Sequence, residues 1–293
     1  MDEPSRSSAE NRRAAELIGA CSIELSPRDE FAGEALRELL APGRTVFVNH
    51  PPSRSHHDIV GACVRLHRAG FVPVPHVAVR HLANFTQASD FLHRVSDEAG
   101  VDRILIIAGD SSPAGPFRAS LDLLATGVVE RHGIRHVAFA AYPEGHPAID
   151  QRVLDATLQA KVAVATQRGL QVSLVTQFGF EAAPILHWTS ALRTAGIQCP
   201  VHIGVAGPAN VATLAKFAIR CGIGASLRAL ARGHTSFARI MMEAGPDALI
   251  AELVAGEAAS GLVERLHVFT FGGVRRTAAW IKAAGVNRAM PGR

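Results

Sequence analysis

The sequence is poor in aromatic residues, in cysteine and in long apolar runs, and each shortage excludes a class of protein. One tyrosine and two tryptophans occur in 293 residues, and the four cysteines lack CxxC spacing. We therefore expect reduced cysteines in a cytoplasmic protein, with neither a disulfide framework nor a metal site. Since no apolar run reaches the roughly 18 residues needed to cross a bilayer, we also expect no membrane association.

Lysine and arginine are not gathered into runs either. The formal net charge of +4 is spread along the chain, which argues against nucleic-acid binding and favours at most an anionic small molecule. The first residues are polar and lack the apolar core of a secretory signal. We expect residues 1–14 to form a flexible N-terminal tail. The sequence leaves the formation of a homo-oligomer open.

What the sequence has in quantity is hydrophobic residues, at 48%, arranged in a regular rhythm. Eight short apolar runs alternate with segments of helical period, a pattern typical of parallel βα units. We predict an α/β fold, a single-domain (β/α)8 TIM barrel over residues 15–293, with extra helices between strands seven and eight. The predicted strands lie at 21–25, 45–49, 72–77, 103–108, 136–141, 171–177, 201–205 and 267–271. The predicted helices lie near 30–40, 55–69, 82–98, 117–131, 151–167, 181–195 and 208–220, with the extra helices near 223–232 and 236–257.

Several of these apolar runs end in polar residues, namely Glu24, Asn49, His76, Asp110 and Gln177. Because the carboxyl ends of barrel strands lie on one face, we expect these side chains to converge there. If Glu24 is partly buried in its apolar strand, we expect desolvation to raise its pKa, so that it can hold and donate a proton near neutral pH. The alternative is a charge at a strand edge without function.

The loop after the fifth strand, Tyr-Pro-Glu-Gly-His-Pro at 142–147, has the composition of a functional loop. Two prolines fix the backbone around Glu144, and Gly145 permits a turn that other residues resist. A packing role would not require this mixture.

Other candidates each have a structural alternative. Gln177 can both donate and accept hydrogen bonds, which suits the edge of a heterocycle. Asp110 is equally well explained as a cap of the next turn, and Lys161 is either a phosphate ligand or one solvated lysine among many. The adjacent histidines at 56–57 do not face one way on a helix, so we predict no metal there. No GxGxxG or P-loop spacing occurs.

Taken together, these segments resemble methylenetetrahydrofolate reductase over most of the chain, from Ser22 to about Trp280. The most specific match is the block Ala-Ala-Tyr-Pro-Glu-Gly-His-Pro at 140–147. Shorter matches follow the family's order and spacing, namely Ser22-Ile23-Glu24, Pro75-His76, Gly109-Asp110, Lys161-Val162 and Thr176-Gln177-Phe178.

The resemblance implies an FAD-containing barrel that uses NAD(P)H as co-substrate to interconvert 5,10-methylenetetrahydrofolate and 5-methyltetrahydrofolate. It implies that Glu24 is the general acid, that Asp110 is a second catalytic residue near flavin and pterin, and that Gln177 and Phe217 contact the substrate. The positions that it implies for flavin binding are Asn49, His76, Gly109, Asp110, Tyr142, His146, Asp155 and Lys161.

The chain also departs from the family pattern. Ala108 stands where an arginine commonly precedes Gly109, and Phe271-Gly272-Gly273 replaces a common Asn-Arg pair. Two alternatives therefore stay open. One is a flavin-independent NAD(P)H–folate reductase of the same fold, and the other is a non-catalytic folate-binding barrel that serves a methyltransferase system.

Overall fold

The computed structural model describes residues 3–221, 245–257 and 263–286. Its eight strands follow one another in chain order around a closed barrel. The predicted α/β TIM-barrel fold is therefore confirmed. The strands are β1 (Ser22–Leu25), β2 (Thr45–Val48), β3 (Val72–Ala78), β4 (Arg103–Ile107), β5 (His136–Ala141), β6 (Gln171–Thr176), β7 (Val201–Ala206) and β8 (Val263–Phe269).

Helices connect the strands, as expected for parallel βα units. No helix within the described ranges has the length and apolar character that crossing a bilayer requires. The α-helices are α1 (Glu3–Gly19), α2 (His56–Arg68), α3 (Phe85–Ala99), α4 (Ser120–Ala125), α5 (Val128–Arg131), α6 (Gln151–Gln167), α7 (Ala182–Thr194), α8 (Val211–Cys221), α11 (Asp247–Glu257) and α12 (Val274–Val286). Two 3-10 helices, η1 (Glu34–Glu38) and η2 (Val79–His81), complete this set.

The chain forms two compact units, each built from separate stretches of sequence. One, the Glu24 unit, comprises Ser22–Ala141 with Asp155–Val175. The other, the Gln177 unit, comprises Met1–Cys21, Tyr142–Leu154 and Thr176–Arg293. The predicted single domain over residues 15–293 stays a prediction.

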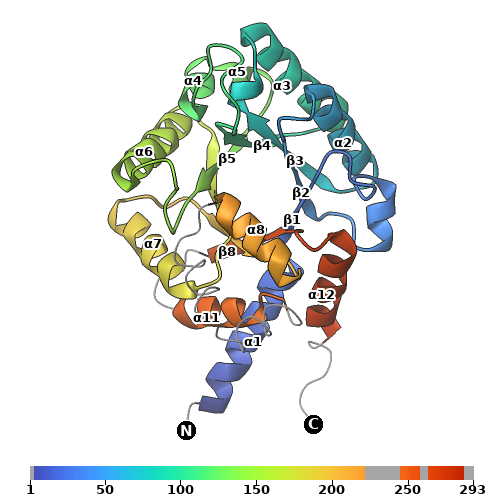
Figure 1. The fold of residues 1–293 in the computed structure, drawn as a ribbon, viewed down its shortest axis with the longest axis vertical. Helices are drawn as coiled ribbons and strands as arrows, with labels where there is room; N and C mark the ends of the chain where they lie inside the picture. The colour runs from blue at the N-terminus through green and yellow to red at the C-terminus, as the bar shows by residue number, and fades with distance from the viewer. Residues whose placement is uncertain (1–2, 222–244, 258–262, 287–293) are drawn as a thin grey trace. The chain divides into compact units, whose positions relative to one another are not determined.

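Each unit has its own buried cluster. In the Glu24 unit, side chains from five strands form one cluster, and parallel register sets Phe47 beside Val74 and Leu105 beside Ala138. Helices α2 and α3 pack against each other on the outer side of these strands (Figure 1). In the Gln177 unit, the buried cluster includes Phe178, Phe180, Ala206, Ala209, Leu214 and Ala218.

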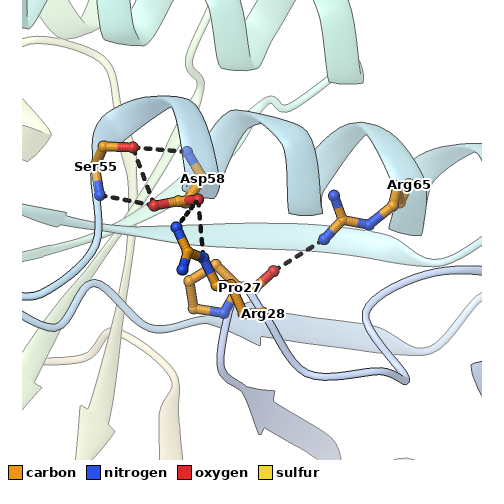
Figure 2. Close-up of polar contacts among 5 residues, drawn as sticks. All are labelled: Pro27, Arg28, Ser55, Asp58 and Arg65. Carbon is orange, nitrogen blue, oxygen red and sulfur yellow. Dashed lines mark hydrogen bonds and ion pairs between the residues drawn. The ribbon is translucent and has the colours of Figure 1, made fainter.

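Helix α2 has a well-defined start, which fixes the loop after β2. Ser55 Oγ accepts from the Asp58 N–H at 3.2 Å, while Asp58 Oδ2 accepts from the Ser55 N–H at 3.0 Å. This reciprocal capping box satisfies two backbone donors. Arg28 pairs with Asp58 at 3.2 Å, and Arg65 Nη2 donates to the Pro27 carbonyl at 2.9 Å, so the loop after β1 is tied to α2 (Figure 2).

The predicted and observed elements differ where tertiary contacts override local pattern. Residues 3–14, which we expected to form a tail, belong to α1, which packs against α11 and α12 within the Gln177 unit. Arg13 Nη2 donates to the Val263 carbonyl at 2.9 Å, and Leu17 and Ile18 are buried. These contacts give a polar helix the support that its own sequence lacks.

Three further helices or strands differ from their predicted bounds. β8 begins at Val263 instead of 267, because buried Val263 and Leu266 extend the strand past the two charged residues between them. The helix predicted near 117–131 divides into α4 and α5, because Gly127 between them has a φ of +68°, which a continuous helix does not allow. The segment near 30–40 forms only the 3-10 helix η1. The extra helix predicted near 223–232 lies outside the described residues.

Candidate functional site

The Glu24 side chain is held between polar neighbours from adjacent strands. Asn49 Nδ2 donates a hydrogen bond to Glu24 Oε1 at 3.3 Å, and His76 Nε2 lies 3.4 Å from Glu24 Oε2. The parallel register explains this meeting, because Val48, just before Asn49, pairs with Pro75, just before His76. We call Glu24, Asn49 and His76 the Glu24 cluster.

The Glu24 cluster is largely removed from water. The side chain of His76 is 9% exposed and that of Glu24 is 15% exposed. Asn49 Oδ1 is buried and accepts no hydrogen bond from the residues that the structure describes. An unpaired buried acceptor costs about 1–3 kcal/mol, so a ligand N–H placed here would be favoured. A carboxyl beside an imidazole can also exchange a proton with a bound molecule.

Gly109 and Asp110 follow β4 in the same unit. Gly109 has a φ of +92°, and a Cβ there would lie 3.2 Å from Ala78 Cβ, so the glycine is required by the backbone itself. Asp110 is exposed, and its charge favours the protonated form of His81. Ser111 Oγ lies 3.2 Å from His81 Nε2. The catalytic and flavin roles of Asp110 stay predictions.

Helix α6 carries two more predicted flavin residues. Lys161 Nζ lies 5.9 Å from the centroid of the Phe139 ring, a cation–π contact, and burial lowers the pKa of its amine. Asp155 is exposed on the same helix. A half-buried lysine with a lowered pKa is consistent with an anion ligand, and equally with a packed aliphatic stem.

In the Gln177 unit, the loops after β5 and β6 line a small open pocket. Gln177 Oε1 accepts from the Phe178 N–H at 3.1 Å, which fixes the amide. Gly179 leaves room for Glu144, since a Cβ there would lie 3.0 Å from Glu144 Oε1. A carboxylate and an amide thus line one concavity, which suits a ligand edge carrying N–H donors. The lining residues are Pro143, Glu144, Gly145, Gln177, Phe178, Gly179 and Ile185.

Three other predicted residues of this unit have contacts within it. The rings of Tyr142 and His146 meet edge-on at 5.0 Å, and His146 Nδ1 accepts from the Ala148 N–H at 3.2 Å. Phe217 stacks on Phe271 with ring centroids 4.0 Å apart and an angle of 14°. Phe217 therefore has a packing role, and its predicted contact with a substrate stays a prediction.

Sequence reasoning missed Glu144 as a site residue and also missed His50 and His81. Glu144 was signalled by its place between two prolines, and the histidines by their positions after β2 and β3. The structure brings the ring of His50 into contact with those of His81 and His56. Sequence reasoning had considered His56 only for metal binding. Within the described ranges, no three histidine, cysteine or acidic side chains are grouped as a metal ion would require.

The residues implied for flavin divide between the two units. Tyr142 and His146 lie in the Gln177 unit, and the other six lie in the Glu24 unit. Among those six, Asn49 and His76 contact Glu24. The positive φ of Gly109 is enough to account for a glycine at that position. These contacts give no specific support for flavin.

Comparison with known proteins supports the fold. No family model matches the chain. An uncharacterized protein from Clostridium thermocellum that binds two copies of 5-methyl-5,6,7,8-tetrahydrofolic acid superposes with a TM-score of 0.63 and 11% identity, over 96% of this chain and 99% of that one. Dihydropteroate synthase from Thermus thermophilus superposes with a TM-score of 0.51 and 17% identity, over 94% and 96% of the two chains. At these identities the likeness establishes the class, an α/β TIM barrel.

Proposed function

We propose that this protein binds a reduced folate and that the Glu24 cluster contacts its pterin ring. The observation that carries the proposal is a buried set of acceptors, the Glu24 carboxylate and the unpaired Asn49 Oδ1. A tetrahydropterin presents several N–H donors along its edge and within its reduced ring. A ring with N–H donors is a ligand that such a cluster can bind.

The comparisons support this choice of ligand. Two proteins of the same fold are each matched over nearly their whole length. One binds 5-methyl-5,6,7,8-tetrahydrofolic acid, and the other is a dihydropteroate synthase. TIM barrels bind their ligands at the carboxyl ends of the strands. Asn49 follows the end of β2, and Glu24 lies one residue before the end of β1.

We further infer that the bound folate is interconverted between its methylene and methyl forms. In the reducing direction, NAD(P)H gives a hydride, with its electron pair, to the methylene carbon. The bond from that carbon to one folate nitrogen breaks, and Glu24 protonates the nitrogen that leaves. His76, 3.4 Å from Glu24, is placed to restore the proton. A partly buried carboxyl beside an imidazole supports this acid role.

A second candidate is folate binding without chemistry, in the service of a methyltransferase system. It is favoured by the likeness to the Clostridium thermocellum protein, which binds 5-methyl-5,6,7,8-tetrahydrofolic acid. The two candidates share the ligand and differ in whether Glu24 transfers a proton. FAD as an intermediate hydride carrier stays a prediction from the sequence resemblance.

The binding proposal is tested by calorimetric titration with 5-methyltetrahydrofolate. Glu24→Gln removes the charge and the acid but keeps the shape. We expect its affinity to fall at least tenfold, about 1.4 kcal/mol. Glu34→Gln is the matched control, because Glu34 is 74% exposed in its pair with Arg37. Equal affinities of Glu24→Gln and the wild type, or no folate binding by the wild type, would refute the proposal.

The reaction is tested separately by following NADH and NADPH oxidation with methylenetetrahydrofolate. We expect turnover by the wild type and a loss of about 100-fold or more in Glu24→Gln. Folate binding without any turnover would favour the non-catalytic candidate. Purified protein that is colourless, and turns over at the same rate with and without added FAD, would favour direct hydride transfer.

A further inference from the structure

Three imidazole rings meet in the Glu24 unit, and the proposed folate site does not use them. His50 lies just after β2, His56 is the first residue of α2, and His81 ends η2 after β3. The ring of His50 meets that of His56 at 5.0 Å and that of His81 at 4.7 Å, both edge-on. Phe91 of α3 packs against His50 and His56. We call His50, His56 and His81 the histidine cluster.

The histidine cluster is poorly supplied with hydrogen bonds. His50 is only 5% exposed. Within the described part of the chain, neither of its ring nitrogens has a partner at the distance and angle of a hydrogen bond. His56 Nε2 is likewise buried without a partner there, whereas His81 Nε2 lies 3.2 Å from Ser111 Oγ. Burying a polar group without a hydrogen-bond partner is destabilising. Packing alone would favour apolar rings at these positions, so the nitrogens point to a ligand.

The N-terminus of helix α2, which carries His56, is a second feature that would attract an anion. α2 is 13 residues long, and the N-terminus of a helix carries a partial positive charge that favours anions. The nearest carboxylate on the helix, Asp58, is already held by Ser55 and paired with Arg28 (Figure 2). Arg28 therefore offsets part of the charge that Asp58 places at the start of the helix.

Burial, and repulsion among the imidazoles, favour the neutral form of the histidine cluster. Burial, followed by repulsion from His56, His81 and His76, lowers the pKa of His50 to about 3, although the His76 carbonyl favours its protonated form. Burial also lowers the pKa of His56 and of His81. Two carboxylates act in the opposite direction, one on α3 and one after β4. They are Asp90, which favours protonated His56, and Asp110, which favours protonated His81.

We propose that the histidine cluster and the first turn of α2 form a subsite for the phosphate or carboxylate group of a small-molecule ligand, and that binding takes up a proton. A protonated imidazole donates through both ring nitrogens, and a dianion offers several acceptors at once. An anion among the rings offsets both the burial and the mutual repulsion that disfavour their protonated forms. This inference goes beyond the folate proposal, because it requires neither Glu24 nor a pterin.

The first experiment uses sulfate, whose charge does not change near neutral pH, as the probe. Calorimetric titration in buffers of different ionisation heat counts the protons taken up by the wild-type protein. We expect proton uptake on binding, and an affinity that rises by up to about tenfold for each pH unit between about pH 8 and about pH 6. Sulfate that binds with no proton uptake, or that does not bind, overturns the proposal.

Two variants connect the binding to the histidines. His50→Phe keeps a ring against Phe91 and removes both nitrogens, so we expect sulfate affinity to fall at least tenfold and proton uptake to disappear. His57→Gln is the matched control, because His57 is the exposed neighbour on the same turn and should behave as the wild type. If His50→Phe fails to fold, His81→Asn is judged by the same criteria. Unchanged sulfate binding in the folded variant overturns the proposal.

Parallel titrations identify the source of the anion. p-Aminobenzoylglutamate carries the carboxylates of a folate tail without the pterin, and NADPH differs from NADH by one phosphate. Loss of p-aminobenzoylglutamate binding in His50→Phe assigns the subsite to the folate tail, and loss of the preference for NADPH assigns it to the nucleotide. Glu24→Gln separates the two proposals, because it should weaken folate binding while sulfate binding and proton uptake stay unchanged.

Discussion

At the scale of the residue, the most consequential feature is a histidine held uncharged in the interior. The lowered pKa of His50, about 3, lies well below its ordinary value of 6.5. Between these two values the unfolded chain binds a proton that the folded chain does not. The contribution of His50 to stability is therefore fully present above about pH 6.5, and it is lost as the pH is lowered through this window, by up to about 1.4 kcal/mol per pH unit.

This pH dependence is measured by urea unfolding in buffers free of sulfate and phosphate. We expect the free energy of unfolding of the wild type to fall between about pH 7 and about pH 5. His50→Phe should lose part of that slope, because one imidazole that resists protonation is gone. The exposed His57→Phe variant should keep the full slope. A slope in His50→Phe as steep as that of the wild type would contradict the assignment of His50.

At the scale of the element, the capping box at the start of α2 stabilises the helix that carries His56 of the candidate anion subsite. Ser55→Ala removes the side chain that accepts from the Asp58 N–H, and we expect a loss of about 1 kcal/mol in the free energy of unfolding. Ser53→Ala, two residues earlier at an exposed position, should change stability by less than about 0.5 kcal/mol. Urea and thermal unfolding measure both variants, and equal stability would show that the capping box contributes nothing.

At the scale of the whole molecule, the two compact units interrupt each other along the chain. The Glu24 unit needs Asp155–Val175 as well as Ser22–Ala141, and Val175 belongs to the same buried cluster as Phe47, Val74, Leu105 and Ala138. A fragment of residues 22–141 lacks that stretch. We expect it to show no cooperative unfolding and little near-ultraviolet circular dichroism when made alone.

Co-expression with residues 142–293 supplies the missing stretch and provides the control. Recovery of a folded complex, seen as cooperative thermal unfolding, is the expected result. A fragment of residues 22–141 that folds cooperatively by itself would show that the interleaved chain is not needed for its core.

Much of the architecture could be predicted because it is encoded at short range. The apolar runs that became β2 and β5 have the length and the β-branched or aromatic residues typical of buried strands, and Gly100 and Gly133 mark the ends of helical segments. The prediction failed for residues 3–14, where α1 depends on packing against α11 and α12. It also failed at the start of β8, where two charged residues interrupt the apolar pattern.

The sequence by itself determined the strand rhythm, the TIM-barrel class and the presence of polar residues at strand ends, since burial of alternating or periodic side chains follows from local order. Only the tertiary structure decided which of those residues meet. Glu24 joins Asn49 and His76, Glu144 shares a pocket with Gln177, and His50 lies among other imidazoles. Such meetings depend on register between strands and on loop paths that join residues far apart in the chain, and no local pattern records those distances.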